Sequence, residues 1–165
     1  LGLDDAACGE VVRTLMRASG AAGMIGGQLL DLEGEGLSLD LAALERVHRH
    51  KTGALIAAAV RLGGLGARAT DAVLDAYARY GDAVGLAFQI ADDVLDVTAT
   101  SDELGKTAGR DVELRKSTYP ALLGIDGARA RAVALADEAC AALDAAGVLT
   151  PALERVARFT VERRS

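Results

Sequence analysis

The sequence predicts an all-α protein, and three observations support this fold class. Apolar residues recur at helical spacing along nearly the whole chain. Ala and Leu, which favour helices, are the two commonest residues. No segment alternates apolar and polar residues over enough positions to indicate a β-strand. Because no Ser- or Pro-rich linker interrupts the pattern, we expect one helical unit over residues 1–165.

The N-terminal part of the chain contains two predicted helices. The first begins at Asp4 or Asp5, either of which could cap it, and runs to about residue 32, where a Gly-rich turn follows. The second follows Asp40, because apolar residues then recur at i, i+3 and i+4. We expect it to end near residue 62, where a cluster of glycines begins.

A third predicted helix starts after a cap at Thr70 or Asp71 and runs to about Val97. Its second half is apolar on most sides, which is typical of a helix buried in a larger bundle. So small a chain can hardly surround such a helix by itself. This helix therefore indicates either an oligomer or further helices that this sequence lacks.

The C-terminal part is predicted to contain one loop and two more helices. The polar stretch 98–115 is interpreted as a loop with a short helical turn. Pro120 stands where the first turn of a new helix tolerates proline. Two helices follow, over roughly residues 126–146 and 151–164.

Composition excludes several functions. The chain has 165 residues, 51% of them hydrophobic, which suffices for one domain with a substantial core. A net charge of −6 and scattered basic residues argue against nucleic-acid binding. The longest uncharged run, residues 18–30, is too short for insertion into a membrane. Since Cys8 and Cys140 lie far apart in sequence, we expect reduced thiols in a cytoplasmic protein.

An acidic motif lies inside the apolar third helix. Gln89, Asp92, Asp93 and Asp96 stand at i, i+3, i+4 and i+7, so their side chains share one stripe of the helix. Like charges at this spacing cost about 0.2–0.5 kcal/mol per pair in water, so a cation is expected nearby. Carboxylates without accompanying His or Cys favour Mg²⁺ over zinc. The alternative is an acidic face that is turned to solvent and paired with lysines.

Basic residues at two places could complete a diphosphate site. Lys106 and Lys116 lie in and just after the polar loop, although a basic loop is more often merely solvated. Lys51 and Thr52 interrupt an apolar helix, so the lysine either extends to water or points into a polar cavity. His48 is interpreted as structural or exposed, because it and His50, two positions on, do not share a helix face.

Gly26 and Gly27 weaken the first predicted helix, by about 1 kcal/mol each relative to alanine. Close contact with another helix best explains their presence. Gln28 and Asp31, one turn apart, lie beside them.

Five stretches together resemble one family. In chain order they are GGQLLDL, HRHKTGAL, GLAFQIADDVLDV, LGK and KSTYPALLG, beginning at residues 26, 48, 85, 104 and 116. They resemble the C-terminal half of a trans-polyprenyl diphosphate synthase, and the bacterial farnesyl and short-chain geranylgeranyl enzymes most of all. The resemblance covers essentially the whole chain. It implies part of the isoprenoid-synthase helical bundle, without its N-terminal helices.

The resemblance also implies a reaction. A homodimeric, Mg²⁺-dependent prenyltransferase would condense an allylic diphosphate (dimethylallyl, geranyl or farnesyl) with isopentenyl diphosphate, and farnesyl diphosphate is the expected product. A geranylgeranyl or longer-chain synthase and a non-catalytic partner subunit are the alternatives. Asp92 would be the principal metal ligand, supported by Asp93 and Asp96.

Further roles follow from the same resemblance. Lys51 would bind the allylic diphosphate, and Thr52 and Gln89 would lie beside the reacting carbon. Lys106 would contact the diphosphate or its metal ions. Lys116 and Asp111 are weaker assignments of the same kind.

Other family motifs are missing from these 165 residues. The first Asp-rich motif, the arginine pair after it and the basic residues that hold isopentenyl diphosphate do not occur, and the sequence does not begin with Met. We therefore expect about the C-terminal half of a family member. Such a fragment should bind diphosphate weakly and should not condense isoprenoids.

Overall fold

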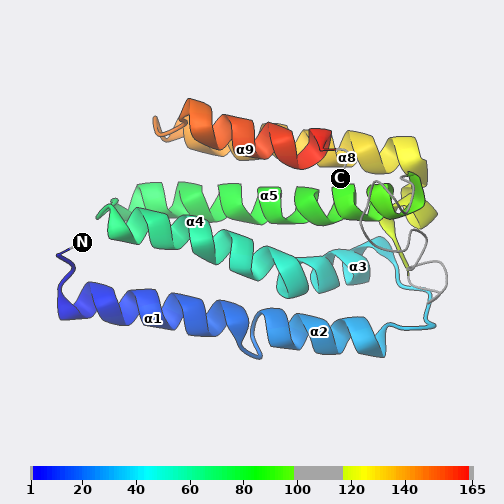
Figure 1. The fold of residues 1–165 in the computed structure, drawn as a ribbon, viewed down its shortest axis with the longest axis horizontal. Coiled ribbons are helices and arrows are strands. Elements are labelled where there is room, and N and C mark those ends of the chain that lie inside the picture. Colours follow the sequence, from blue (N-terminus) through cyan, green and yellow to red (C-terminus); the bar gives the residue numbers. More distant parts are fainter. Residues whose placement is uncertain (1, 99–116, 164–165) are drawn as a thin grey trace.

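The computed structural model describes residues 2–98 and 117–163, and these parts contain helices and connecting segments but no β-strand. The expected all-α class is confirmed for them. The elements run roughly along one axis (Figure 1). They are α1 (Asp5–Ser19), α2 (Met24–Glu33), α3 (Leu41–His48), η1 (Arg49–Gly53), α4 (Ala54–Gly66), α5 (Asp71–Thr98), α8 (Tyr119–Ala145) and α9 (Pro151–Glu162).

The first predicted helix is two helices, so the expectation of a single one to residue 32 is wrong. Asp4 caps α1 as predicted, and its side chain accepts a hydrogen bond from the N–H of Ala7 at 2.8 Å. The break between α1 and α2 ends at Gly23, where a Cβ would lie 2.0 Å from the carbonyl oxygen of Ala18. Only glycine fits this turn, and the sequence pattern on either side of it gives no sign of the break.

The second predicted helix is continuous in sequence but irregular. Asp40 caps it through the N–H of Ala43, and the chain stays helical through α3, η1 and α4 to Gly66 rather than residue 62. The middle element, η1, is a π-helix of five residues that contains Lys51 and Thr52. Such wide turns are rare and often occur at functional sites.

The long helix α5 forms the centre of the molecule, as its apolar second half predicts. It packs against α4 on one side and α8 on the other, and α9 also contacts it. Leu86 and Ile90 are fully buried there, and each such side chain contributes about 1.5–3 kcal/mol by leaving water. Tyr80, also fully buried, donates its hydroxyl to the carbonyl of Leu153 at 2.7 Å and so ties α5 to α9.

The C-terminal helices differ from prediction mainly at their boundaries. Thr118 caps α8, and Pro120 lies in its first turn as expected. Gly124 (φ 73°) kinks α8, and therefore the predicted helix over 126–146 corresponds to its longer second part. Helix α9 ends at Glu162, two residues before the predicted limit.

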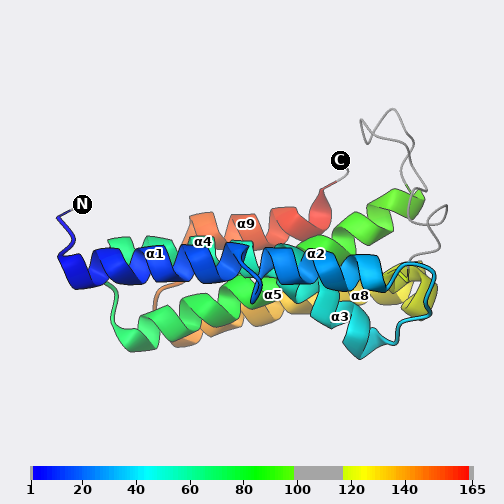
Figure 2. The same cartoon turned by 90° about the horizontal axis from the view of Figure 1, so that it is seen from below.

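One face of the molecule exposes large apolar side chains. Helices α1 and α2 lie in front in the view from below (Figure 2), and Val12, Met16, Ile25 and Leu29 on them are at least half exposed. This fits the expectation from α5 that a partner or further helices surround the unit. Among the described helices, none combines the length and the hydropathy required to cross a membrane.

Candidate functional site

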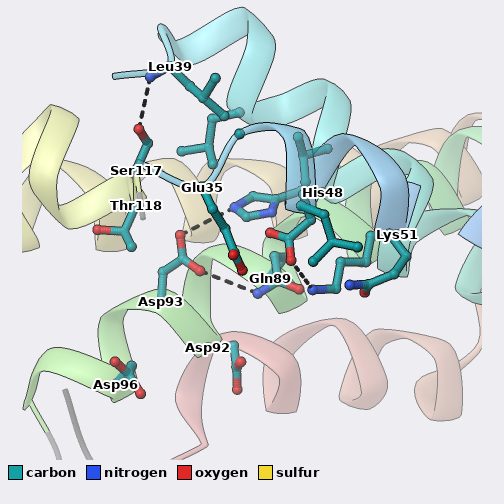
Figure 3. A pocket seen from close by; sticks show the side chains of 16 residues that line it. Glu35, Leu39, His48, Lys51, Gln89, Asp92, Asp93, Asp96, Ser117 and Thr118 are labelled. Carbon is teal, nitrogen blue, oxygen red and sulfur yellow. Dashed lines mark hydrogen bonds and ion pairs between the residues drawn. The ribbon is translucent and has the colours of Figure 1, made fainter. Parts of the chain in front are cut away.

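A cavity of about 510 Å³ opens between α2, α3, η1, α5 and the start of α8 (Figure 3). Acidic side chains predominate among its polar lining residues, and Lys51 is its one lysine among the described residues. The polar residues that line it are Gln28, Asp31, Glu35, His48, Lys51, Gln89, Asp92, Asp93, Asp96, Ser117 and Thr118. The cavity thus brings together three of the five family-like stretches and part of a fourth.

Lys51 points into this cavity, which decides between the two interpretations that the sequence left open. Its Nζ donates to Asp31 Oδ2 at 2.7 Å, and its side chain is 35% exposed. A Cβ on Gly27 would lie 2.1 Å from the backbone nitrogen of Lys51. The close helix contact predicted for the glycine pair is therefore confirmed at Gly27. It lets α2 bring Asp31 next to the lysine.

Gln89 links Thr52 to the acidic motif. The hydroxyl of Thr52 donates to Gln89 Oε1 at 2.9 Å, and Gln89 Nε2 donates to Asp93 Oδ1 at 3.3 Å. Gln89 lines the cavity, whereas Thr52 reaches it only through this contact. Two adjacent residues of η1 therefore contact two different helices: Lys51 contacts Asp31 on α2, and Thr52 contacts Gln89 on α5.

The three acids of the motif all line the cavity, but their surroundings differ. Asp93 and Asp96 are 3% and 4% exposed, so a solvated acidic face is excluded for them. Asp93 Oδ2 accepts from His48 Nε2 at 3.3 Å and from the N–H of Tyr119 at 3.0 Å. Asp92 is half-buried and pairs with Arg163 at 3.4 Å.

These residues fit a magnesium ion in part. Mg²⁺ commonly takes one or two carboxylates from the protein and completes its shell with water and substrate phosphates. Asp92 and Asp96, one turn apart on α5, offer such a pair at the cavity wall. In the described parts of the chain, no three acidic, His or Cys side chains converge as a ready-made metal cage. The site thus suits a metal that arrives with a phosphate ligand.

Two residues at the site escaped sequence reasoning. Tyr119 stacks on His48 with ring centroids 5.8 Å apart and donates its hydroxyl to Glu45 at 2.7 Å. Burial and the neighbouring Glu45 carboxylate raise the pKa of Tyr119, so it remains a protonated donor. Arg163 lies over the Phe88 ring at 4.2 Å, and its contact with Asp92 spans 71 positions of sequence. No local pattern could have indicated it.

His48 is buried and structural, in line with the sequence interpretation, and it lines the cavity as well. His50 Nδ1 contacts the carbonyl of Arg46 instead, so the two histidines face different surroundings. The remaining site predictions, Lys106, Lys116 and Asp111, lie outside the described residues.

Comparisons with known proteins agree on one family. The model of the polyprenyl synthetase family matches residues 4–147. Farnesyl diphosphate synthase of Escherichia coli is 51% identical over 161 residues, which cover 93% of this chain and 53% of that protein. Dimethylallyltranstransferase of Fischerella ambigua is 54% identical over 131 residues, or 79% of this chain and 38% of that protein. The chain thus spans about half the length of the curated relatives it matches.

Solved structures are similar as well. A geranyltransferase from Helicobacter pylori, complexed with magnesium and isoprenyl diphosphate, is 32% identical with a TM-score of 0.81, and the match covers 97% of this chain and 52% of that one. A polyprenyl synthase from Caulobacter crescentus, complexed with calcium and isoprenyl diphosphate, is 30% identical with a TM-score of 0.87. That match covers 94% of this chain and 60% of the other.

Proposed function

Because the chain belongs to the polyprenyl synthetase family, we propose that it provides one wall of the active site of a Mg²⁺-dependent trans-prenyltransferase. The reaction would join an allylic diphosphate to isopentenyl diphosphate. The observation that carries the proposal is the cavity itself, in which Lys51 and the carboxylates of Asp92 and Asp96 lie among the same lining residues. Carboxylates with a lysine suit a substrate that brings both phosphate and metal.

In this proposal the protein's own groups bind and orient the diphosphate. Asp92 and Asp96 would hold magnesium, which when bound neutralises charge on the departing diphosphate. Lys51 would exchange its contact with Asp31 for the diphosphate. This exchange replaces one ionic partner of a partly exposed lysine with another. Preorganised positive charge acts mainly on the leaving group, where negative charge develops as the allylic cation forms.

Gln89 and Thr52 would lie beside the reacting carbon. The Thr52 hydroxyl donates to Gln89 Oε1, which keeps the amide in one orientation at the cavity wall. The oxygen of that amide offers a partial negative charge that favours a nearby carbocation. Neither residue carries a formal charge, so neither competes with the diphosphate for magnesium.

We propose farnesyl diphosphate as the product. The farnesyl diphosphate synthases of Escherichia coli and Haemophilus influenzae match over 93% and 94% of this chain, at 51% and 41% identity. The geranylgeranyl pyrophosphate synthases 9 and 12 of Arabidopsis thaliana match over 79% and 78%, at 44% identity. Geranylgeranyl diphosphate is therefore the second candidate. Product analysis of the active enzyme by chromatography separates the two.

The proposal includes a homodimer in the cytoplasm. The exposed apolar side chains of α1 and α2, Met16 and Ile25 among them, support burial against a second copy. Both cysteines are free thiols, as in a reducing compartment. Light scattering after gel filtration measures the oligomeric state, and a monomer at micromolar concentration would contradict the dimer.

Calorimetric titration with geranyl diphosphate tests the binding site. We expect weak heat that depends on Mg²⁺ and disappears in Asp92→Ala, because the variant loses a proposed metal ligand. No Mg²⁺-dependent heat in the unmodified chain would contradict the site. The isolated chain should also form no longer product from labelled isopentenyl diphosphate. Turnover by the pure 165-residue chain would show that this expectation of inactivity is wrong.

A further inference from the structure

We propose that Asp93, the central acid of the motif, is a positioning residue that joins four helical elements, and that it does not ligate the metal. This inference rests on the proposed function, because it divides two roles among three neighbouring acids of the same site. It departs from the sequence expectation that Asp93 supports Asp92 as a ligand. The evidence is the set of donors that already surround the Asp93 carboxylate.

Both oxygens of Asp93 accept hydrogen bonds within the protein. Oδ2 accepts from His48 Nε2 at 3.3 Å and from the N–H of Tyr119 at 3.0 Å, and Oδ1 accepts from Gln89 Nε2 at 3.3 Å. The side chain is only 4% exposed. A carboxylate offers about four acceptor sites, so three of them are in use. The one remaining site is on Oδ1, so a metal that took both oxygens of Asp93, or the place of any of the three donors, would leave a buried donor without its acceptor, which is strongly unfavourable.

The donors come from different elements, and so Asp93 acts as a joint. His48 is the last residue of α3, Gln89 lies on α5, and Tyr119 opens α8. The His48 and Tyr119 rings are stacked, with 18° between their planes, so the carboxylate fixes two groups that also hold each other. Tyr119 reaches back to Glu45 of α3 through its hydroxyl. One buried acid therefore sets how α8 begins relative to α3 and α5.

Through Gln89 the same carboxylate orients a cavity group. A carboxylate can only accept, so Gln89 must present its NH₂ to Asp93 and its carbonyl oxygen to Thr52. The contact thereby extends to η1. The substitution Asp93→Asn would place a second NH₂ opposite that of Gln89, and two donors would then face each other. The amide of Gln89 would have to reverse.

The neighbouring acids have different contacts. In Figure 3 the carboxylates of Asp92 and Asp96 lie apart from the His48–Asp93–Gln89 contacts. Asp92 is 35% exposed and pairs with Arg163, the residue that follows α9. A cation at Asp92 would compete with a 3.4 Å contact to Arg163, whereas a cation at Asp93 would face three converging donors within the core.

Matched variants on adjacent residues test the inference. Asp93→Asn and Asp92→Asn change one atom each, and the probe is Mn²⁺ with inorganic diphosphate, followed by calorimetry. We expect Asp93→Asn to lower the thermal midpoint by about 3–8 °C and to keep the Mn²⁺ affinity within about threefold. Asp92→Asn should keep the midpoint within about 2 °C and lower the affinity at least about tenfold.

Nuclear magnetic resonance measures the chemical shifts of individual amide groups, which a general loss of stability does not change in the folded protein. In metal-free protein, Asp93→Asn should shift the Tyr119 backbone amide and the Gln89 side-chain amide, whereas Asp92→Asn should leave both in place. Adding Gln89→Glu to Asp93→Asn restores an acceptor opposite the new NH₂. The double variant should therefore recover at least half of the decrease in thermal midpoint that Asp93→Asn causes. Failure of this rescue would contradict the contact through Gln89.

Two results would overturn the proposal. One is a loss of Mn²⁺ affinity in Asp93→Asn as large as in Asp92→Asn. The other is a thermal midpoint that Asp93→Asn leaves unchanged. If the unmodified chain takes up no Mn²⁺ with diphosphate, the proposed half-site fails. The role of Asp93 is then still decided by the midpoint, the two resonances and the rescue.

Discussion

Replacing Gly27 with alanine should loosen the contact between α2 and η1. The added Cβ would lie 2.1 Å from the nitrogen and 2.5 Å from the Cα of Lys51, and both atoms belong to the backbone. The two elements must therefore move apart, because no side chain can swing away. Overpacking of this kind costs about 1–3 kcal/mol, and the gain of alanine over glycine inside a helix returns about 0.5–1 kcal/mol. Because the clash is with backbone atoms, the upper part of the overpacking range, about 2–3 kcal/mol, applies, and after a helix gain of about 1 kcal/mol we expect a net loss of about 1–2 kcal/mol.

Gly63→Ala is the matched control. Gly63 lies inside α4, and a Cβ there meets nothing within 4 Å, so only the helix gain of about 0.5–1 kcal/mol remains. Thermal unfolding followed by circular dichroism should show a midpoint about 2–8 °C lower for Gly27→Ala and a raised midpoint for Gly63→Ala. The Gly27 variant should also bind geranyl diphosphate more weakly, since Lys51 moves with η1.

The reasoning would be refuted if both variants gained stability. That result would mean that α2 and η1 can separate at no cost, and that Gly27 is not required for the contact. Urea titration gives an independent measure. Equal slopes for the two variants and the unmodified chain would show that the midpoints report stability and not a change in the unfolded state.

Two further predictions concern Tyr80 and Arg163. Burial raises the pKa of Tyr80 to about 12, so the stability that its protonated form contributes is complete below pH 10 and is lost as the pH rises to 12. Between pH 9 and 12, the urea midpoint should therefore fall less steeply with pH in Tyr80→Phe than in the unmodified chain. An equal fall of the midpoint in both proteins would contradict this. Arg163→Gln should raise the affinity for Mg²⁺ with diphosphate about twofold to fivefold, because the Arg163 guanidinium competes with the metal ion for Asp92. Calorimetry measures this affinity, and weaker binding in the variant would contradict the prediction.

Sequence reasoning works best where a physical requirement is local. The buried half of α5 is predictable because apolar residues occupy most sides of one helix. The cap at Asp4 is predictable because the contact is local: the short side chain accepts from the free N–H of Ala7, only three residues further along the chain. Lys51 and Gln89 are identifiable as candidates, since polar residues on apolar helices need a polar destination.

The remaining features depend on distances between elements that the sequence does not encode locally. The turn at Gly23 requires glycine because any Cβ there would clash with the carbonyl oxygen of Ala18, and this close approach arises only from the way the chain turns after α1. Asp31 and Lys51 are 20 positions apart, and their contact depends on how closely α2 approaches η1. The three acids of the motif look alike in sequence. In the structure, the donors around Asp93 and the arginine beside Asp92 distinguish their surroundings.

The π-helical turn explains why glycines accompany the site residues in the family-like stretches. The π-helical turn of η1 contains an extra residue and is wider than an α-helical turn. The backbone of η1 therefore extends closer to the helices packed against it. Glycine stands on both sides: a Cβ at Gly27 of α2 would lie 2.1 Å from Lys51, and one at Gly85 of α5 would lie 2.8 Å from the Cα of Gly53. Two helices can thus hold η1 between them.

This packing has a chemical consequence. Because α2 and α5 touch opposite sides of η1, the adjacent residues Lys51 and Thr52 each meet a partner within 2.9 Å, Asp31 on α2 and Gln89 on α5. A regular helix separates adjacent side chains by about 100°, and without close neighbours both would end in solvent or in the core. In the proposed site the glycines would therefore serve binding indirectly, since they bring the lysine and the amide to one cavity wall. Any substitution that widens these contacts should weaken diphosphate binding without touching a residue that binds it.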